Sequence, residues 1–473
     1  MKAKLRLLVV VALVAATVLT VVSGAKADTV RTLTGTLPDG ATWKAEVPPN
    51  WNGTLLLYSH GYVFPGRPNP ALDVGDPLTG GFLLANGFAL AGSSYAHTGW
   101  ALQEGIGDQL GVLDEFRAQV GRPTTTIAWG HSLGGIMTAG LVQAAPERFD
   151  GALPMCGVLA GGVGTWNLAL DVLFAFKVLL GGGAPLDIVR ITDPVTNFQL
   201  ANQLLATARS TPQGRARLGL VAALGDSPGW TDPTKPEPAR DDFATRLANQ
   251  IGSIGSLGLP FGFFARAELE ARAGGNPSWN TGVDYAHQLS HSIDLAEVQA
   301  LYGAAGLDLH ADLQTLNQAQ RISADPGAVQ YLSDHVSFNG DLGGVPVLSI
   351  HTTNDPLVDV EQEQAYASAV GRAGDSDLLR QAFVNRAGHC AFTPAETLAA
   401  VQTLLDRVHS HSWLGVRTDP AALNARAAAL GSQFNIIAAG VPAGPSYERF
   451  QPAMFLRPFD LAPSHRQGQG EAA

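Results

Sequence analysis

The chain has 473 residues, 46% of them hydrophobic, which is enough for one large α/β domain with an insertion. Its formal net charge of −11 argues against nucleic acids and anionic membrane surfaces as partners. The sequence has neither a repeat of solenoid period nor a heptad run, which argues against a repeat protein or a coiled coil.

Residues 1–27 have the features of a signal peptide. Three basic residues precede a mostly apolar run over residues 7–22, and residues 25–27 read Ala-Lys-Ala, a small-residue cleavage signal. We therefore expect cleavage near Ala27 and a secreted mature protein of formal charge −15, since four basic residues are removed. A membrane anchor is the alternative, although the apolar run is short for one. No later segment is expected to span a bilayer.

The chain before residue 121 shows strand and helix patterns in turn. Residues 30–36 and 41–47 alternate apolar and polar side chains around Pro38-Asp39-Gly40, which predicts an antiparallel hairpin. The next predicted elements are a buried strand over residues 54–58, a strand over 88–91 and a helix over 107–120.

The stretch 124–136 carries the clearest chemical signature. A β-branched and aromatic run predicts a strand over residues 124–129, and good helix formers follow the sequence Gly-His-Ser-Leu-Gly at 130–134. Strand, G-x-S-x-G and helix in this order make a nucleophile elbow. Ser132 would sit on a sharp turn, and the two glycines would let the strand and the helix pass closely.

At this point the sequence resembles the α/β-hydrolase superfamily in its lipase and esterase form, over about residues 30–158 and 344–411. The resemblance implies a mostly parallel central sheet flanked by helices, with catalytic residues in the chain order Ser, acid, His. It also implies an oxyanion hole made by backbone N–H groups. Because His60-Gly61 follows a predicted strand, the two donors would be those of Tyr62 and Leu133. An ordinary glycine turn is the alternative.

The acid and the base are expected after the next two core strands. A strand over 345–351 runs into Asp355, which matches the superfamily position of the triad acid, and Asp359 is the nearest alternative. A strand over 378–384 is followed by His389 in a loop that contains a glycine, where the base belongs. A purely structural histidine at this position is the alternative.

Residues 159–343 break the alternation of strands and helices. They are mostly helical by pattern and too long for a connection, so we interpret them as a cap or lid inserted after the strand that follows the elbow helix. Residues 28–158 and 344–411 would form the core, and 412–473 a C-terminal extension whose last ten or so residues we expect to be disordered. The very apolar segments 168–176 and 257–264 either pack on the core or line an acyl or aromatic pocket.

The two cysteines, Cys156 and Cys390, suggest one disulfide in an oxidising compartment. Both should lie at the carboxyl end of the sheet, where a bridge would pin the histidine loop. Two separate thiols are the alternative. Tannases and fungal feruloyl esterases also tie this loop through a Cys after the His. They place the other Cys beside the Ser, however, where this chain has His131 and Leu133.

These features predict a secreted serine hydrolase that cleaves carboxylic esters, with Ser132 as nucleophile, His389 as base and Asp355 as its orienting acid. No cofactor or metal is expected. His287 and His291 stand four apart on a predicted helix, but the sequence lacks the glutamate of H-E-x-x-H and a third ligand.

Three other functions stay open at this stage. A secreted peptidase uses the same groups, although prolyl-peptidase relatives usually carry an aromatic residue where Leu133 stands. An acyltransferase differs only in excluding water. A binding protein on an inactive hydrolase fold is disfavoured, since all three triad positions are filled. Small-molecule and polymeric esters both remain open as substrates.

Overall fold

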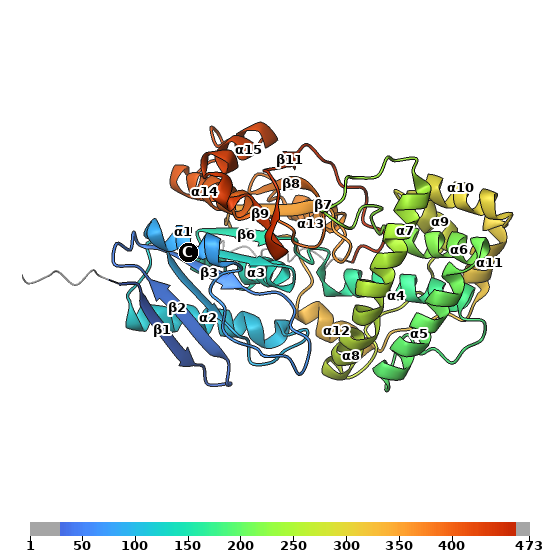
Figure 1. The fold of residues 1–473 in the computed structure, drawn as a ribbon. Coiled ribbons are helices and arrows are strands. Elements are labelled where there is room, and N and C mark those ends of the chain that lie inside the picture. Colours follow the sequence, from blue (N-terminus) through green and yellow to red (C-terminus); the bar gives the residue numbers. More distant parts are fainter. Residues whose placement is uncertain (1–28, 460–473) are drawn as a thin grey trace, which may run out of the picture.

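The computed structural model describes residues 29–459, so the predicted signal peptide and the C-terminal residues expected to be disordered lie outside the described part. One sheet, seen in Figure 1, has the strand order β1-β2-β4-β3-β5-β6-β7-β8-β11. Its strands are β1 (Arg31–Thr36), β2 (Thr42–Val47), β3 (Thr54–Ser59), β4 (Ala89–Ser93), β5 (Thr125–His131), β6 (Gly151–Met155), β7 (Val347–Asn354), β8 (Leu379–Ala387) and β11 (Tyr447–Glu448). All pairs from β4 to β8 are parallel, and the pairs at both edges are antiparallel. This is the mostly parallel sheet that the sequence predicts.

Helices cover both faces of the sheet because successive strand residues point to opposite sides. Leu55 and Leu57 of β3 join one hydrophobic cluster, and Leu56 and Tyr58 join the other. The first face is covered by α2 (Leu102–Gln119), α3 (Leu133–Ala144) and α13 (Gln362–Ala373), and the second by α1 (Pro77–Ala85) and α14 (Pro394–Ser410). The sheet is therefore the middle of three layers, and its parallel strands are buried on both faces.

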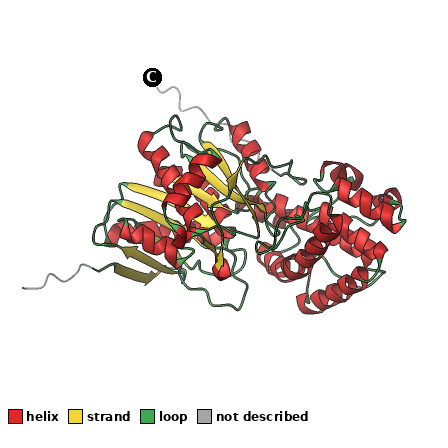
Figure 2. Cartoon of the chain, turned by 45° about the horizontal axis from the view of Figure 1, so that its top comes forward, coloured by secondary structure: helices red, strands yellow, loops and turns green. Residues whose placement is uncertain are grey.

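The segment between β6 and β7 consists of helices joined by loops, and it lies to one side of the sheet (Figures 1 and 2). It has a hydrophobic core of its own. Its elements are α4 (Gly161–Leu180), α5 (Pro194–Arg209), α6 (Pro212–Ala223), α7 (Phe243–Ser253), the π-helical turns η2 (Ile254–Gly258) and η3 (Phe261–Ala265), α8 (Arg266–Ala273), α9 (Tyr285–His291), α10 (Leu295–Ala305), α11 (Leu309–Gln318) and α12 (Pro326–Asp334). We call this segment the cap; its limits at residues 159 and 343 stay a prediction.

Helix α4 corrects one expectation from the sequence. It is long and apolar enough to cross a membrane by length and composition, whereas no such segment was expected after residue 27. Most of the helix is buried, and its residues Leu170 and Leu173 to Phe176 belong to the core of the cap. A helix that is apolar nearly all round is therefore explained here by burial among other helices.

Residues after 411 pack back onto both parts of the molecule. Helix α15 (Pro420–Ala429) is capped by Asp419, whose side chain accepts a hydrogen bond from the backbone N–H of Ala422. Strand β11 extends the sheet beside β8, and β9 (Ile436–Ile437) pairs with β10 (Val441–Pro442). Farther on, Phe455 is fully buried against Leu168 of α4 and Ala365 of α13.

Candidate active site

Ser132 occupies the turn between β5 and α3. Its backbone has φ 58° and ψ −120°, a conformation that serine rarely adopts, and its N–H donates to the carbonyl of Met155. The turn depends on the flanking glycines: a Cβ at Gly134 would lie 1.9 Å from the carbonyl oxygen of Ser59, and one at Gly130 would lie 2.5 Å from the same atom. The geometry is that of the nucleophile elbow predicted from the sequence.

The structure brings the three predicted triad residues together. The Nε2 atom of His389 lies 2.8 Å from the Oγ of Ser132, and its Nδ1 lies 2.7 Å from Oδ2 of Asp355. These are hydrogen-bond distances along the full chain of serine, imidazole and carboxylate. Ser132 and His389 are partly exposed, whereas Asp355 is buried, so solvent reaches the first two groups and not the third.

Asp355 is held as an anion by the groups around it. Burial by itself would raise the pKa of this carboxyl, but His389 and His351 outweigh that effect and lower it below the usual value. The second oxygen accepts hydrogen bonds from the backbone N–H groups of Leu357 and Val358, at 2.9 and 3.0 Å. The carboxylate is therefore both charged and fixed in orientation toward His389.

His351 is the site residue that the sequence did not indicate. It lies in β7, with Nε2 3.6 Å from Oδ2 of Asp355 and 2.9 Å from the carbonyl oxygen of Val358. Its Nδ1 lies 3.2 Å from Oε1 of Glu363. Burial alone would lower the pKa of His351, but the carboxylates of Asp355 and Glu363 raise it to about 10. A buried imidazolium thus lies beside the carboxylate of Asp355, near the same oxygen, Oδ2, that bonds to His389.

The loop that carries His389 is held by three restraints. Cys156, directly after β6, forms a disulfide with Cys390, as the sequence suggests. The alternative of two separate thiols is therefore wrong. Thr393 and Glu396 make reciprocal side-chain to backbone hydrogen bonds at the start of α14, and Glu396 also binds Arg386 at the end of β8. The loop is thus fixed at both ends and tied across to β6.

The predicted oxyanion loop lies against the nucleophile. A Cβ on Gly61 would be in van der Waals contact with Ser132, 3.5 Å from its Cβ and 4.0 Å from its Oγ, so the loop passes directly beside the nucleophile. Leu133 is the first residue of α3, where backbone N–H groups have no partner within the helix. The assignment of the Tyr62 and Leu133 N–H groups as oxyanion donors stays a prediction.

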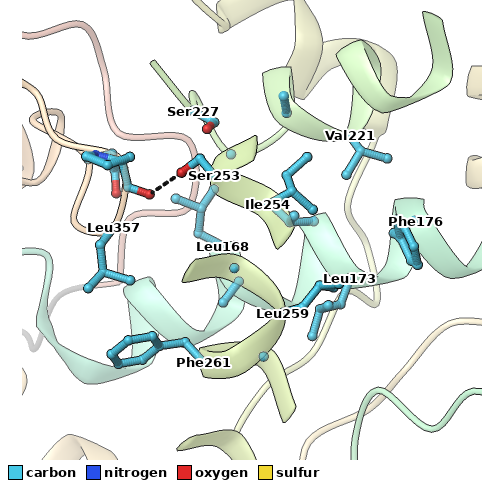
Figure 3. Close-up of a pocket in the computed structure, with 18 of the residues that line it drawn as sticks. Leu168, Leu173, Phe176, Val221, Ser227, Ser253, Ile254, Leu259, Phe261 and Leu357 are labelled. Carbon is cyan, nitrogen blue, oxygen red and sulfur yellow. Dashed lines mark hydrogen bonds between the residues drawn. The ribbon is translucent and has the colours of Figure 1, made fainter. Parts of the chain in front are cut away.

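A cavity of about 160 Å³ adjoins the acid loop, on the cap side (Figure 3). Its walls come from α4, the end of α6, the π-helical turns η2 and η3, and the loop after β7. Both apolar segments singled out in the sequence contribute, through Leu168, Leu173, Phe176, Leu259 and Phe261. The aromatic ring of Phe261 also packs on Tyr62, with ring centroids 5.4 Å apart, so the cavity wall touches the predicted oxyanion loop.

Two other candidates from the sequence, a histidine pair as metal ligands and Asp359 as triad acid, lie in surroundings that do not suit those roles. His287 and His291 pack ring to ring on the exposed surface of α9, and the described residues contain no group of three side chains suited to a metal ion. Asp359, the alternative triad acid, is buried, and its Oδ1 accepts a hydrogen bond from Gln362; the carboxylate bonded to His389 is that of Asp355.

Comparison with known proteins places the chain among hydrolases. No family model matches it. It is 31% identical to the o-phthalyl amidase of Xanthobacter agilis over 444 residues, which is 88% of this chain and 95% of that protein. Among solved structures, an esterase from Aspergillus oryzae is 14% identical with a TM-score of 0.41, covering 81% of this chain and 80% of that one. Feruloyl esterase B from the same organism is 16% identical with a TM-score of 0.36 and the same coverage. By the identity and coverage of the amidase, the chain belongs to the o-phthalyl amidase family, and its mostly parallel sheet flanked by helices is the α/β-hydrolase fold.

Proposed function

We propose that the protein hydrolyses carboxylic esters through an acyl-enzyme intermediate on Ser132. The observation that carries the proposal is the continuous set of hydrogen bonds from Ser132 through His389 to Asp355. No metal or organic cofactor enters the proposed reaction.

The chemical steps follow from this geometry. His389 takes the proton of the Ser132 hydroxyl as Oγ attacks the substrate carbonyl, and the resulting imidazolium is stabilised by the carboxylate of Asp355. The N–H groups of Tyr62 and Leu133 would hold the oxyanion. His389 then passes its proton to the leaving alcohol, and a water molecule, activated by the same histidine, releases the acid and restores Ser132.

Amide hydrolysis is the second candidate, and the family relationship favours it. The relative that is 31% identical to this chain over 444 residues is named an amidase. The same triad cleaves amides when His389 protonates a leaving amine, so the two candidates differ in leaving group and not in machinery. Leu133 in place of an aromatic residue is the sequence feature that favours esters.

A turnover assay of residues 28–473 separates the candidates. We would compare p-nitrophenyl esters from acetyl to palmitoyl with matched p-nitroanilides, and use Ser132→Ala as the blank. We expect ester turnover that is lost in the variant, together with labelling of the parent protein by a fluorophosphonate. Turnover of anilides without preference for esters would establish the amidase instead. Absence of both turnover and labelling would show that Ser132 is not activated.

We further propose that the protein is secreted through cleavage of residues 1–27. The pairing of Cys156 with Cys390 is compatible with an oxidising compartment. Amino-terminal sequencing of the exported protein should read from Asp28, and protein retained with an intact residue 1 in the membrane fraction would contradict secretion.

A further inference from the structure

The cavity beside the acid loop, the loop after β7 that carries Asp355, is apolar and has no cation in its walls. Most of its lining is aliphatic, and Trp166, Phe176 and Phe261 supply aromatic rings. The described residues that line it include no lysine, arginine or histidine. An anionic group in this space would lose its hydration without meeting an opposite charge, which is unfavourable.

The two carboxylates that border the cavity, those of Asp355 and Asp359, are already bonded or buried. Oδ1 of Asp355 accepts hydrogen bonds from two backbone N–H groups, and its Oδ2 bonds to His389. Oδ1 of Asp359 accepts a hydrogen bond from Gln362, and its Oδ2 is buried, so it is not an acceptor on the cavity surface. A cationic group would therefore also lose its hydration here without gaining a free carboxylate oxygen, and an uncharged group suits the cavity best.

The size of the cavity limits what it can hold. Its volume is about 160 Å³, and an apolar cavity of about 150 Å³ binds benzene. One aromatic ring therefore fills the space, whereas a fused pair of rings exceeds it.

One side of the cavity adjoins the residues around the nucleophile. Phe261 and Leu357 line the cavity and pack against the hydrophobic cluster that contains Leu133, the residue after Ser132. The ring of Phe261 also packs on that of Tyr62 in the predicted oxyanion loop. Figure 3 shows Phe261 and Leu357 on one side of the cavity and Phe176 on the other. A group that enters beside Phe261 and Leu357 would thus extend from the oxyanion loop into the cap.

We propose that this cavity binds the acyl part of the substrate as a single uncharged aromatic ring, so that the enzyme prefers benzoyl-type acyl groups to those that carry a carboxylate or an amine. The assignment to the acyl part rests on the proposed function, because the oxyanion donors hold the acyl carbonyl and Phe261 packs on one of them, Tyr62. Two π-helical turns form part of the wall, and such turns are frequent at functional sites.

Binding can be measured without turnover, on the full mature chain with Ser132→Ala. Benzamide, benzoate and benzamidinium have nearly the same shape and differ in charge, and 2-naphthamide adds a second ring. In NMR titrations at pH 7.5 we expect benzamide to bind about tenfold or more tighter than either ion and than 2-naphthamide. Adding Ala169→Trp, which fills the cavity from α4, should weaken benzamide by about tenfold or more. Lys177→Trp, on the same helix but outside the lining, is the control and should leave its affinity unchanged.

Three results would overturn the proposal. They are an ion that binds as tightly as benzamide, 2-naphthamide that binds as tightly as benzamide, and benzamide affinity that survives in folded Ala169→Trp. If Ala169→Trp does not fold, Ala169→Leu fills part of the cavity, and unchanged affinity for benzamide in that variant has the same meaning.

Turnover by proteins that retain Ser132 tests the assignment to the acyl part. Because p-nitrophenyl benzoate and p-nitrophenyl acetate share a leaving group, the ratio of their kcat/KM values reports on the acyl group alone. We expect Ala169→Trp to lower this ratio about tenfold and Lys177→Trp to leave it unchanged. An unchanged ratio in Ala169→Trp, together with lost benzamide binding, would overturn the acyl assignment. Absence of fluorophosphonate labelling would instead overturn the proposed function, and the titrations, made without Ser132, would still decide which group the cavity binds.

Discussion

Asp355 interacts with two histidines that have different surroundings. His389 faces the nucleophile and is partly exposed, whereas His351 is fully buried and bonded to Glu363. Both imidazoles approach Oδ2 of Asp355, and together they keep this carboxylate ionised in spite of its burial. The buried ion pair of His351 and Glu363 therefore supports Asp355, and it also contributes to the stability of the fold.

Replacement of His351 by glutamine should change the pH dependence of stability. The folded-state pKa of about 10 exceeds the ordinary value of 6.5, so the stabilisation is complete below pH 6.5 and is lost as the pH rises toward 10. At pH 6 we expect the variant to be about 3–5 kcal/mol less stable, because Glu363 is left buried without its cation.

Urea denaturation at a series of pH values checks this prediction. The difference in free energy of unfolding between parent and variant should shrink between pH 6.5 and 10. A constant difference over this range would show that His351 is neutral in the folded protein.

The three triad residues could be predicted from the sequence, but the buried pair of His351 and Glu363 beside Asp355 could not. Ser132, Asp355 and His389 each follow a recognisable strand, in the chain order that the superfamily requires. His351 lies inside a strand and Glu363 on a helix 12 residues later, and nothing in the sequence shows that the two side chains meet.

At the level of elements, the elbow depends on the close passage of β3, β5 and α3. Gly134→Ala would put a methyl group 1.9 Å from the carbonyl oxygen of Ser59, so the backbone must move. We expect a loss of more than about 3 kcal/mol or failure to fold, with loss of activity.

Gly107→Ala is the matched control for this change. Gly107 is exposed on α2 and a Cβ there meets nothing within 4 Å, so alanine should raise stability by about 0.5–1 kcal/mol. Thermal unfolding of both variants measures the contrast. Equal effects at the two positions would mean that the elbow tolerates a side chain at 134.

The disulfide is the second element-level restraint on the site. Cys156 and Cys390 are 234 residues apart, and closing so long a loop is worth about 5 kcal/mol by chain entropy. The double variant Cys156→Ser with Cys390→Ser should lose stability of this order and lose activity in addition, because the loop carries His389.

Reduction of the parent protein with dithiothreitol, followed by alkylation, should have the same effect as the double variant. Activity and melting temperature are read before and after treatment, and the double variant treated in the same way is the control. Unchanged activity in a fully alkylated protein would show that the capping box at α14 holds the histidine loop unaided.

Most strands and helices could be predicted because each combines a clear hydrophobic period with turn residues at its ends. The ends themselves shift where packing extends an element. Helix α2, for example, begins at Leu102 instead of residue 107. Among the added residues, Leu102 and Gly105 are buried, so tertiary contacts supply part of what local propensity does not.

Across the whole molecule, the C-terminal segment joins the core to the cap. Strand β11 pairs with β8, and farther along the chain Arg457 forms an ion pair with Asp171 of α4 and donates to the carbonyl of Trp279 at 2.8 Å. Asp171 is fully buried. Residues 447–457 thus hold the cap against the sheet from outside.

Arg457→Ala should loosen this connection. We expect a loss of about 3–5 kcal/mol, because Asp171 keeps its burial and loses its cation. Limited proteolysis should then cut within the cap before the core. Arg426→Ala, which removes an exposed ion pair with Asp406, should cost less than about 1 kcal/mol and serves as control. A cap as resistant in Arg457→Ala as in the parent would refute the joining role.

The insertion of the cap between two neighbouring strands has a consequence for the growing chain. Ser132 and His389 are 257 residues apart, so the ribosome needs roughly 13–50 s to travel from one to the other. During that interval β6 exposes the edge that β7 will later occupy, and the nucleophile has no base. Each new molecule therefore passes through a period in which Ser132 has been synthesised but His389 has not, so the reaction cannot take place. Termination of translation anywhere in the cap would leave an inactive fragment with an exposed sheet edge, which is prone to pair with other copies of the fragment.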